Sequence, residues 1–459
     1  MQRFMEPKSV VLVGAPRRSG PGAYNNLEVM ERFGYPGTIY VVHPKVESIC
    51  GHRTYPDIDS LPEAPDLAVI SVGRDRVLAV FDACIRRGIK QVIVISQGFS
   101  DADSEGKRLQ AELRSKAKEY GVQVVGPNTM GVLNAFAGFS TAFVDIPRES
   151  PAWPLGLIAQ SGVLQVGFES FVQHVGKAVD LGNMCDVDFV DALEYFEQDP
   201  QIRMVAVHME GVQRGRELLQ VAGRVARTKP VVVFKTGRSE AGARAALTHT
   251  GSLVGADEVA DSAFRQHGIL RVSSMAELLA ACKAFLHLPL MRGPNLSVIT
   301  AAGASGIMAA DACEDFGLQL APFPESLRGS LENERIAWHR LHNPVDIWPL
   351  GMVTGSFTSV FQTAAQGLAA DPGTDAILGI APVMRSALHS DLDLEPTLRE
   401  VLQSAEEPKP LALWLYGDGA REQEEKLDPM PGVACFSSID EAVMGLAATY
   451  RYARLQRKA

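Results

Sequence analysis

The sequence predicts an α/β fold with parallel sheets, divided among three domains. Short runs rich in β-branched residues alternate with amphipathic helical stretches along the chain, which is the pattern of parallel strands joined by crossover helices. With 459 residues, the chain is too long for a single hydrophobic core. Its 41 glycines gather where the predicted strands end, at the turns that lead into helices.

The first predicted domain, residues 1–145, carries near-continuous apolar runs, as expected for strands that are covered on both faces. These strands are Ser9–Val13, Thr38–Val42, Leu67–Ser71, Gln91–Ile95 and Val122–Val125. Helices are predicted between them at Tyr24–Phe33, Asp75–Arg87 and Ser104–Tyr120. A linker rich in proline and aromatic residues, Phe139–Pro154, closes the domain.

Two further domains are predicted, over residues 150–288 and 292–459, with the linker Pro289–Asn295 between them. The second has strands at Leu155–Ala159, Ala178–Leu181, Met204–His208 and Val231–Phe234, and closing helices at Glu258–Gln266 and Ser274–Phe285. The third has strands at Leu296–Thr300, Ala376–Ile380 and Leu411–Leu415, and a last helix at Ile439–Tyr452.

Charge and cysteine content argue against several classes of protein. The net charge of −10 is spread along the chain without a basic stripe, so nucleic-acid binding is not expected. The 6 cysteines lie far apart with no CxxC pair, as is typical of reduced cytosolic thiols and not of disulfides or a metal site. No apolar run reaches the roughly 20 residues of a membrane helix. Because the first strand begins at about Ser9, we expect no signal peptide and a cytoplasmic location.

The most informative stretch is Lys235–Asp257, KTGRSEAGARAALTHTGSLVGAD, which surrounds His249 with small and hydroxyl residues. Cations precede the histidine, and no bulky apolar residue lies beside it to pack the imidazole into a core. A neutral imidazole among backbone N–H groups, with cations nearby, is suited to taking up and passing on a phosphoryl group. The alternative is a solvated histidine in a turn.

The second and third domains open alike, with an apolar strand, a turn of small and hydroxyl residues, and a helix. Leu155 begins LGLIAQSGVLQVGF, and Leu296 begins LSVITAAGASGIMAADA. Such a turn exposes free N–H groups at the start of the helix, where anions bind. Alternatively, the small residues serve only to pack the helix onto the sheet.

The first domain starts like a nucleotide-binding domain but lacks the dinucleotide fingerprint. Gly14-Ala15-Pro16-Arg17-Arg18 follows the first strand without a GxGxxG. The second strand runs into His43-Pro44-Lys45 in place of the acidic residue that binds a ribose hydroxyl. A cation there favours a phosphorylated ribose or a diphosphate, and coenzyme A has both, although a solvated loop lysine is the alternative. Further strand-end loops should line the same crevice: Ser71-Val72-Gly73, Ser96-Gln97-Gly98 and Gly126-Pro127-Asn128.

These motifs resemble those of the ADP-forming acyl-CoA synthetases, which are related to succinyl-CoA synthetase. SVVLVGA, GYPGTIYVVHPK, QVIVISQGF and GPNTMGVLN look like the CoA-binding domain of that family. AQSGVL, DLGNMCDVDFVDALEYFEQDP, VHMEGV and the His249 segment look like its next domain, and NPVDIWP resembles its third domain. The resemblance covers nearly the whole chain. It implies a Rossmann-like CoA-binding domain followed by two flavodoxin-like domains.

The resemblance also implies roles for individual residues. His249 would be the phosphohistidine, and Glu210 would be the acid that holds and orients its imidazole. Ser161, Gly162, Thr250 and Gly251 would bind the phosphoryl group, and the turn Gly303-Ala304-Ser305-Gly306 would form a second phosphate site. The residues that would contact coenzyme A are Gly14, Ala15, Arg17, Lys45, Ser71, Val72, Gly73, Ser96, Gln97, Gly98 and Asn128.

Three positions depart from the family pattern. TAAGASG stands where the family usually shows a glycine pair and an asparagine, Pro16 stands where a serine is common, and SVGRD replaces a proline-containing loop.

The implied reaction is reversible: acyl-CoA, ADP and phosphate give a carboxylate, CoA and ATP through an acyl phosphate and a phosphohistidine. No stretch resembles the ATP-grasp domains that hold ATP or ADP and Mg²⁺. The chain therefore looks like an alpha subunit with an ATP-grasp beta partner, in an α₂β₂ assembly by resemblance, and no metal site of its own is expected. The substrates implied are a small carboxylic acid and its CoA thioester.

Three alternatives belong to other function classes. A CoA-binding regulatory or scaffold protein that has lost catalysis would not need to keep both His249 and Glu210. A CoA transferase or thioester hydrolase needs a glutamate or serine nucleophile in a constellation that is not visible. A nicotinamide dehydrogenase needs the missing GxGxxG.

Overall fold

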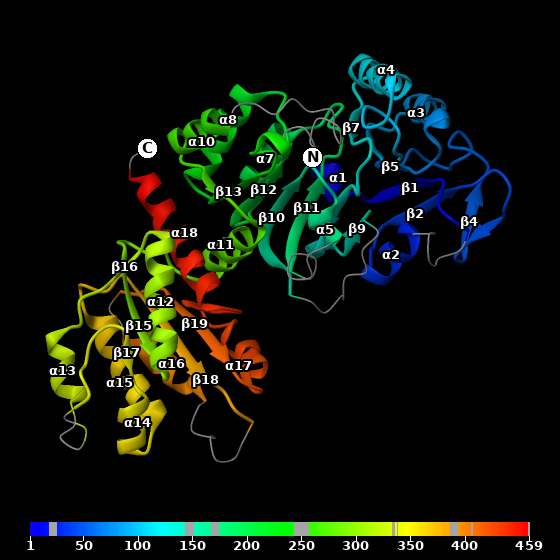
Figure 1. Cartoon of the computed structure of the whole chain (residues 1–459). Coiled ribbons are helices and arrows are strands. Elements are labelled where there is room, and N and C mark those ends of the chain that lie inside the picture. Colours follow the sequence, from blue (N-terminus) through cyan, green and yellow to red (C-terminus); the bar gives the residue numbers. More distant parts are fainter. Residues whose placement is uncertain are drawn as a thin grey trace. The chain divides into compact units, whose positions relative to one another are not determined.

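The computed structural model describes residues 1–17, 25–142, 151–166, 174–242, 257–332, 336, 338–385, 393–404 and 407–457. It divides into two compact units, Met1–Val272 and Ser273–Ala459. Each unit consists of mostly parallel strands with helices packed against them (Figure 1). The predicted α/β class with parallel sheets is confirmed.

The N-terminal sheet has the strand order β3-β4-β2-β1-β5-β6-β7. Its strands are β1 (Ser9–Val13), β2 (Thr38–Val42), β3 (Ser48–Ile49), β4 (His52–Tyr55), β5 (Leu67–Ile70), β6 (Gln91–Val94) and β7 (Gln123–Val125). Every pair is parallel except β3 with β4. The helices of this part are α1 (Gln2–Met5), α2 (Asn26–Phe33), α3 (Arg74–Arg87) and α4 (Ser104–Tyr120).

Both faces of this sheet are buried, which explains the continuous apolar sequence of its strands. On β1, Val10 and Leu12 pack in the core that includes α2, whereas Val11 and Val13 pack in the core that includes α3 and α4. Helix α4 begins where the Asp103 carboxylate accepts the N–H of the third helical residue at 2.7 Å. The result is a doubly wound layer whose strands end at one common edge.

The second sheet has the order β14-β13-β12-β10-β11-β8-β9. Its strands are β8 (Val132–Asn134), β9 (Phe139–Ser140), β10 (Trp153–Ala159), β11 (Val175–Asp180), β12 (Met204–Met209), β13 (Val231–Lys235) and β14 (Leu270–Val272). The strands β10 to β14 pair in parallel, whereas β8 pairs antiparallel with β11 and β9. The described helical segments are η1 (Ala135–Ala137), α5 (Val163–Val166), α7 (Phe189–Gln198), α8 (Gly215–Ala226) and α10 (Asp257–Gln266).

The first two sheets are joined by a shared core and by a buried ion network. Strands β8 and β9 lie within residues 1–145, yet they extend the second sheet. The Lys177 side chain on β11 is 1% exposed, and its ammonium contacts Glu6 Oε1 at 2.8 Å and Asp199 Oδ2 at 2.7 Å. Since Glu6 precedes β1, these contacts attach the N-terminus of the chain to the second sheet.

The C-terminal unit has one sheet, in the order β16-β15-β18-β19-β20, with β17 added alongside β15. Its strands are β15 (Asn295–Thr300), β16 (Gln319–Leu320), β17 (Val345–Asp346), β18 (Ala376–Pro382), β19 (Leu411–Tyr416) and β20 (Val433–Phe436). Its helices are α11 (Met275–His287), α12 (Gly303–Phe316), α13 (Glu325–Leu331), α14 (Trp348–Thr354), α15 (Phe357–Ala370), α16 (Leu394–Ser404), α17 (Ala420–Leu427) and α18 (Ile439–Gln456).

Helix α11 belongs to this unit because it packs on α18. Ala280 and Ala284 of α11 share a core with Val443 and Leu446 of α18. The C-terminal unit therefore begins at Ser273, and the domain bounds 1–145, 150–288 and 292–459 stay predictions.

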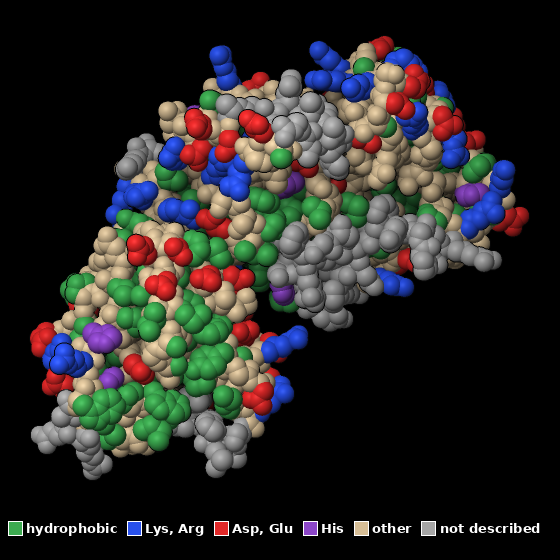
Figure 2. Space-filling view, viewed as in Figure 1, with side chains coloured by type: hydrophobic (Ala, Val, Ile, Leu, Met, Phe, Trp, Pro, Cys, Tyr) green, Lys and Arg blue, Asp and Glu red, His purple; other side chains and the backbone are tan. Residues whose placement is uncertain are grey.

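The surface carries mixed charge. In Figure 2, Lys and Arg side chains are interspersed with Asp and Glu on the face that is shown. In the described part of the chain, we find no helix with the length and apolar character needed to traverse a bilayer.

Candidate functional site

A cavity of about 660 Å³ lies at the carboxyl ends of β1, β2 and β5 in the first sheet. Its lining includes six of the residues that were predicted to contact coenzyme A: Gly14, Ala15, Arg17, Lys45, Ser71 and Val72. Gly14 has φ +94°, and a Cβ there would lie 2.3 Å from the Ser71 carbonyl oxygen. Only glycine permits this close approach of the two strand ends.

The cavity has an excess of available positive charge. Arg17, Lys45 and Arg76 line it, and none of them forms an ion pair with a carboxylate among the described residues. Two acids also line it: Asp59 pairs with Arg86 at 2.9 Å, and Asp57 accepts from the Ser60 amide and hydroxyl. The lining cations still outnumber the acids, and beside an apolar wall that includes Ile58 they fit a phosphorylated nucleotide.

The predicted His43-Pro44-Lys45 turn is held by its own histidine. His43 Nδ1 accepts the Lys45 N–H at 3.1 Å and the Val46 N–H at 3.2 Å. Burial lowers the pKa of His43, and the charges of Arg17 and Lys45 lower it further. The imidazole is therefore neutral, with its proton on Nε2, and it fixes the backbone from which Lys45 projects.

The other predicted CoA loops meet at the same sheet edge but do not line this cavity. The Ser96 hydroxyl donates to the Val72 carbonyl at 2.6 Å, and its carbonyl accepts the Asn128 N–H at 3.0 Å. Arg74 of α3 donates to the Gly98 carbonyl at 2.9 Å. Gly73 is the N-cap of α3 and follows Val72 directly. Gln97 lies between Ser96 and Gly98. These bonds bring the ends of β5, β6 and β7 together.

The first strand–turn–helix corner follows β10 of the second sheet. The Gln160 side chain accepts the Glu210 N–H at 2.8 Å and the Gly211 N–H at 3.0 Å, which ties the corner to the end of β12. Ser161 and Gly162 follow and are half-buried. A Cβ at Gly162 would lie 2.4 Å from Met130 Cγ, so the turn is packed too closely for any larger residue.

Three ionisable side chains stand at the strand ends behind this corner. Glu210 follows β12 and is 9% exposed, Asp180 ends β11 at 1%, and His208 lies on β12 at 5%. Burial, and then the charge of Glu210, raises the pKa of Asp180 to about 6. Burial lowers the pKa of His208 to about 4, so this imidazole is neutral at pH 7.

The segment predicted to carry the phosphohistidine starts at the end of β13. His249, Thr250 and Gly251 lie outside the described residues, which stop at 242 and resume at 257. The start of the segment is described: Lys235 ends β13 and is buried, and the Thr236 hydroxyl lies 3.5 Å from His208 Nε2. The segment that carries His249 therefore leaves the sheet one strand away from Glu210.

The second corner belongs to the C-terminal unit. Gly303 opens the 14-residue helix α12, and no side chain caps the helix start. Behind the turn, Ser305 Oγ donates to the Ala302 carbonyl at 2.8 Å and lies 2.7 Å from Thr300 Oγ1. Gly306 packs against Pro344, and Gly303 and Ala304 are exposed. An uncapped helix start of this kind offers free N–H groups to an anion.

Comparison with known proteins decides the family. The family described as CoA binding domain matches residues 8–135, and the succinyl-CoA ligase like flavodoxin domain matches residues 153–285. The alpha subunit of ADP-forming acetate–CoA ligase I from Pyrococcus furiosus is 33% identical over 469 residues, which is 100% of this chain and 99% of that protein. The chain belongs to the family of ADP-forming acyl-CoA ligases.

Other members of the ligase family agree. ADP-forming acetate–CoA ligase II from Archaeoglobus fulgidus is 32% identical, and the match covers 98% of this chain but only 66% of that longer protein. The solved structure of a dinucleotide-forming acetyl-coenzyme A synthetase from Ca. Korarchaeum cryptofilum, in complex with phosphate and ADP, has a TM-score of 0.86. It is 29% identical and covers 99% of this chain and 97% of that one. The resemblance seen in the sequence is confirmed.

For this acyl-CoA ligase, the structure adds residues that the sequence did not reveal. In the sequence, Arg76 looks like a surface residue of a helix, yet it lines the 660 Å³ cavity. Its position three residues after Gly73 could have suggested this. Asp180 opens the motif DLGNMCDVDF, and His208 lies in VHMEGV two residues before Glu210, but neither residue was singled out. The sheet order, in which β10 lies between β11 and β12, brings Asp180 to the same edge as Glu210.

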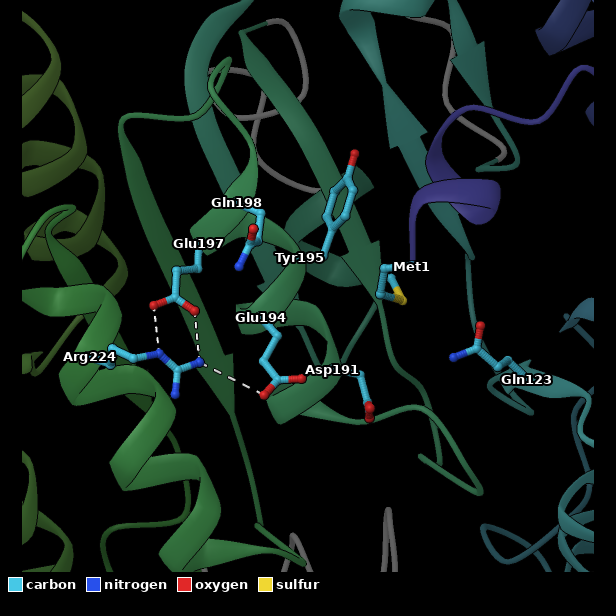
Figure 3. A pocket seen from close by; sticks show the side chains of 8 residues that line it. All are labelled: Met1, Gln123, Asp191, Glu194, Tyr195, Glu197, Gln198 and Arg224. Carbon is cyan, nitrogen blue, oxygen red and sulfur yellow. Dashed lines mark hydrogen bonds and ion pairs between the residues drawn. The ribbon is translucent and has the colours of Figure 1, made fainter.

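One further cavity of the ligase contains none of the predicted site residues. It measures about 490 Å³ and lies beside α7 and α8 (Figure 3). Arg224 points at two acids there, with contacts of 2.7 Å to Glu197 and 3.8 Å to Glu194. Asp191, Tyr195 and Gln198 also line it. Its acids make it a poor site for a phosphorylated ligand.

Proposed function

We propose that this chain is the alpha subunit of an ADP-forming acyl-CoA synthetase that works with an ATP-grasp beta subunit. The observation that carries the proposal is its match to a separate alpha subunit over 99% of that protein's length. The longer relatives, of which the chain spans about two thirds, are consistent with a missing portion supplied by a second chain.

In the proposed reaction, phosphate attacks the thioester carbonyl, the C–S bond breaks, and CoA leaves as the thiolate that takes up a proton. The acyl phosphate then gives its phosphoryl group to a nitrogen of His249, and the carboxylate is released. ADP bound to the beta subunit with Mg²⁺ accepts the phosphoryl group and becomes ATP. The reverse sequence makes the thioester, and the acyl group is that of a small carboxylic acid.

Glu210 is proposed to accept a hydrogen bond from one nitrogen of the His249 imidazole, which leaves the other nitrogen free to attack phosphorus. Its position supports the role, because the backbone that carries Glu210 is fixed by the Gln160 side chain. The carboxylate is thus delivered from a rigid strand end, as a positioned catalytic group requires.

Coenzyme A is proposed to bind in the 660 Å³ cavity, with its phosphates against Arg17, Lys45 and Arg76. The loops at Ser96–Gly98 and Asn128 would continue the site along the sheet edge toward the second sheet. Bidentate arginine contacts to phosphate are among the stronger charge-assisted hydrogen bonds. These three cations have no carboxylate partner among the described residues, which supports this assignment.

The turn at Ser161 and Gly162 is proposed to hold the phosphoryl group with Thr250 and Gly251, and the turn Gly303–Gly306 to serve as the second phosphate site. Exposed apolar side chains surround the second turn: Ile307 and Met308 on α12, and Trp348 and Met352 on α14. Figure 2 shows hydrophobic side chains gathered over this part of the C-terminal unit. Such a patch supports a partner protein at this turn.

The test is reconstitution. The chain is mixed with a beta subunit, ATP, CoA and acetate, and thioester formation is measured with and without the second protein. The proposal predicts thioester only when both chains are present, and none with His249→Asn. Thioester formation by the chain alone, or full activity of His249→Asn, would rule out the proposed assignment.

A further inference from the structure

Asp180 is a buried carboxylate at the seam between the first two sheets, and the mechanism proposed above does not use it. It ends β11 and is 1% exposed. Its Oδ2 accepts the Met130 N–H at 2.7 Å, and its Oδ1 accepts the Gly182 N–H at 3.2 Å. A carboxylate this deeply buried needs such donors, and here they come from two different loops.

One side of this carboxylate supports the predicted phosphate turn. A Cβ built on Gly162 would lie 3.4 Å from Asp180 Oδ2, so the carboxylate lies close beneath the turn. The same Cβ would collide with Met130 Cγ. Met130 and Asp180, which are hydrogen-bonded to each other, together form the surface beneath Gly162.

The other side continues into the predicted CoA loops. The Thr129 hydroxyl donates to the Asp180 carbonyl, and a Cβ on Gly182 would lie 2.4 Å from the Asn128 carbonyl oxygen. Asn183 donates to the Pro127 carbonyl at 2.9 Å through its N–H and to Asp101 Oδ1 at 2.7 Å through its side chain.

Asp101 in turn accepts the Gly98 N–H at 3.2 Å. A continuous chain of contacts therefore runs from the loop at Gly98, through Asp180, to the turn at Gly162.

We propose that Asp180 is a positioning residue for the ligase reaction, which holds the phosphate turn at Gly162 in register with the CoA loop at Asn128–Met130. The proposal rests on the function proposed above. In the proposed reaction, the attacking phosphate is bound at the second sheet. The CoA that carries the thioester is bound at the first sheet. A shift of about 1 Å between two reacting groups costs on the order of 100-fold in rate. Asp180 fixes the Met130 backbone, and the Met130 side chain packs against Gly162, so the carboxylate sets that distance.

The charge state of Asp180 gives the proposal a distinct signature. The pKa of about 6 arises from burial first, with Glu210 at the end of β12 adding to it, while the Met130 and Gly182 amides and the Thr129 hydroxyl oppose the rise. Ionised Asp180 accepts both backbone N–H groups, and protonation weakens this hold. The rate of phosphoryl transfer to the protein should therefore fall as the pH falls through about 6.

A nearby acid provides the matched control. Asp186 lies six residues further along the same segment, its pKa is also raised by burial, and its Oδ2 accepts the Val124 N–H at 2.9 Å. It joins the same two sheets through one backbone hydrogen bond. Among the described contacts, none links it to Gly162 or to a predicted CoA loop.

The experiment compares wild type, Asp180→Asn and Asp186→Asn, each assembled with the beta subunit. The rate of phosphoryl transfer from acyl-CoA and labelled phosphate to the protein is measured from pH 5 to pH 8, together with CoA affinity and thermal unfolding. The proposal predicts that Asp180→Asn lowers the rate on the order of 100-fold and removes the loss below pH 6. CoA affinity should change by less than about 3-fold, because the cavity cations are intact.

Asp186→Asn should keep the wild-type rate and the wild-type pH profile. Equal rate losses in the two variants, or an unchanged acid limb in Asp180→Asn, would overturn the positioning role. If Asp180→Asn does not unfold cooperatively, the variant is not folded and the pH profile of the wild-type rate is the test. A wild-type rate that stays constant between pH 5 and pH 7 overturns the proposal. Absence of any labelled phosphohistidine in wild type would instead overturn the proposed function itself.

Discussion

The two strand–turn–helix corners start from similar sequences but are supported by different chemical groups. Behind Ser161 and Gly162 in the first unit lie the buried carboxyl groups of Asp180 and Glu210. Behind the turn that opens α12 in the C-terminal unit lie the hydroxyl groups of Thr300 and Ser305. The first corner is backed by two buried carboxyl groups, whereas the second is backed by a pair of hydroxyls and has its acid, Asp346, in a half-buried position beside Gly303.

This difference indicates a division of labour that the turn sequences alone do not show. We propose that both turns face an anion, but the acids beside them differ in burial. Asp180 at the first corner is almost fully buried and its pKa is raised to about 6, whereas Asp346 at the second corner is only half-buried. A proton-linked step with a midpoint near pH 6 is therefore expected at the first corner.

The largest effect is expected at Glu210. Replacing Glu210 with Gln removes the negative acceptor that we propose for the His249 imidazole, so phosphoryl transfer to the protein should fall about 100-fold or more. The measurement is the single-turnover rate of protein phosphorylation with the beta subunit present. Glu194→Gln, in the separate acidic cavity of Figure 3, is the control and should keep the wild-type rate. A Glu210→Gln enzyme of normal speed would contradict the assignment.

The next effect concerns pH and stability near the same corner. His208 has its pKa lowered from 6.5 to about 4, because the buried imidazole resists protonation. Its contribution to stability is therefore complete above about pH 6.5 and is lost as the pH falls toward 4. Between pH 7.5 and pH 4.5, wild type should lose about 2 to 3 kcal/mol more than His208→Gln does. Urea unfolding at both pH values measures this, and parallel losses would show that His208 is not the responsible group.

How well the sequence predicts a strand depends on the length of that strand and on how far away in the sequence its pairing strand lies. Strands β1 and β2 were predicted with the bounds that the structure shows, because each is a continuous apolar run. Strands β8 and β9 were missed because they are short, and their partner β11 lies beyond a linker. Of the cations that line the cavity, Lys45 was predicted because it follows a strand, but Arg76 was missed because it lies in a helix. Asp180 was missed, although it opens the motif DLGNMCDVDF, because its contacts are with loops that lie far away in the sequence.

A moderate effect should separate the two corners by packing. Gly162→Ala places a Cβ 2.4 Å from Met130 Cγ, whereas the Cβ of Gly303→Ala lies 3.5 Å from Asp346 Oδ2, at ordinary contact. The first change should cost about 1 to 3 kcal/mol. The second should cost less than about 0.5 kcal/mol, since alanine also favours the helix. Thermal unfolding of the two variants measures the contrast, and equal losses would mean that the corners are packed alike.

The smallest effect is expected at the second corner. Ser305→Ala removes the hydroxyl that bonds to Ala302 and Thr300, at a cost of about 1 kcal/mol. This cost should stay constant from pH 5 to pH 8, since neither hydroxyl titrates there. Denaturant unfolding across that range is the measurement. A cost that varies with pH would show that the hydroxyl pair is coupled to an ionisable group such as Asp346, and it would contradict the comparison.

The most direct test of the account is the chemical identity of the phosphorylated residue. The protein with its beta subunit is incubated with acyl-CoA and labelled phosphate, and the label is located by peptide mass spectrometry. We predict one acid-labile, base-stable phosphoryl group per chain, on His249, and none in His249→Asn. Label on another residue, or thioester cleavage at full speed without any labelled protein, would contradict the account.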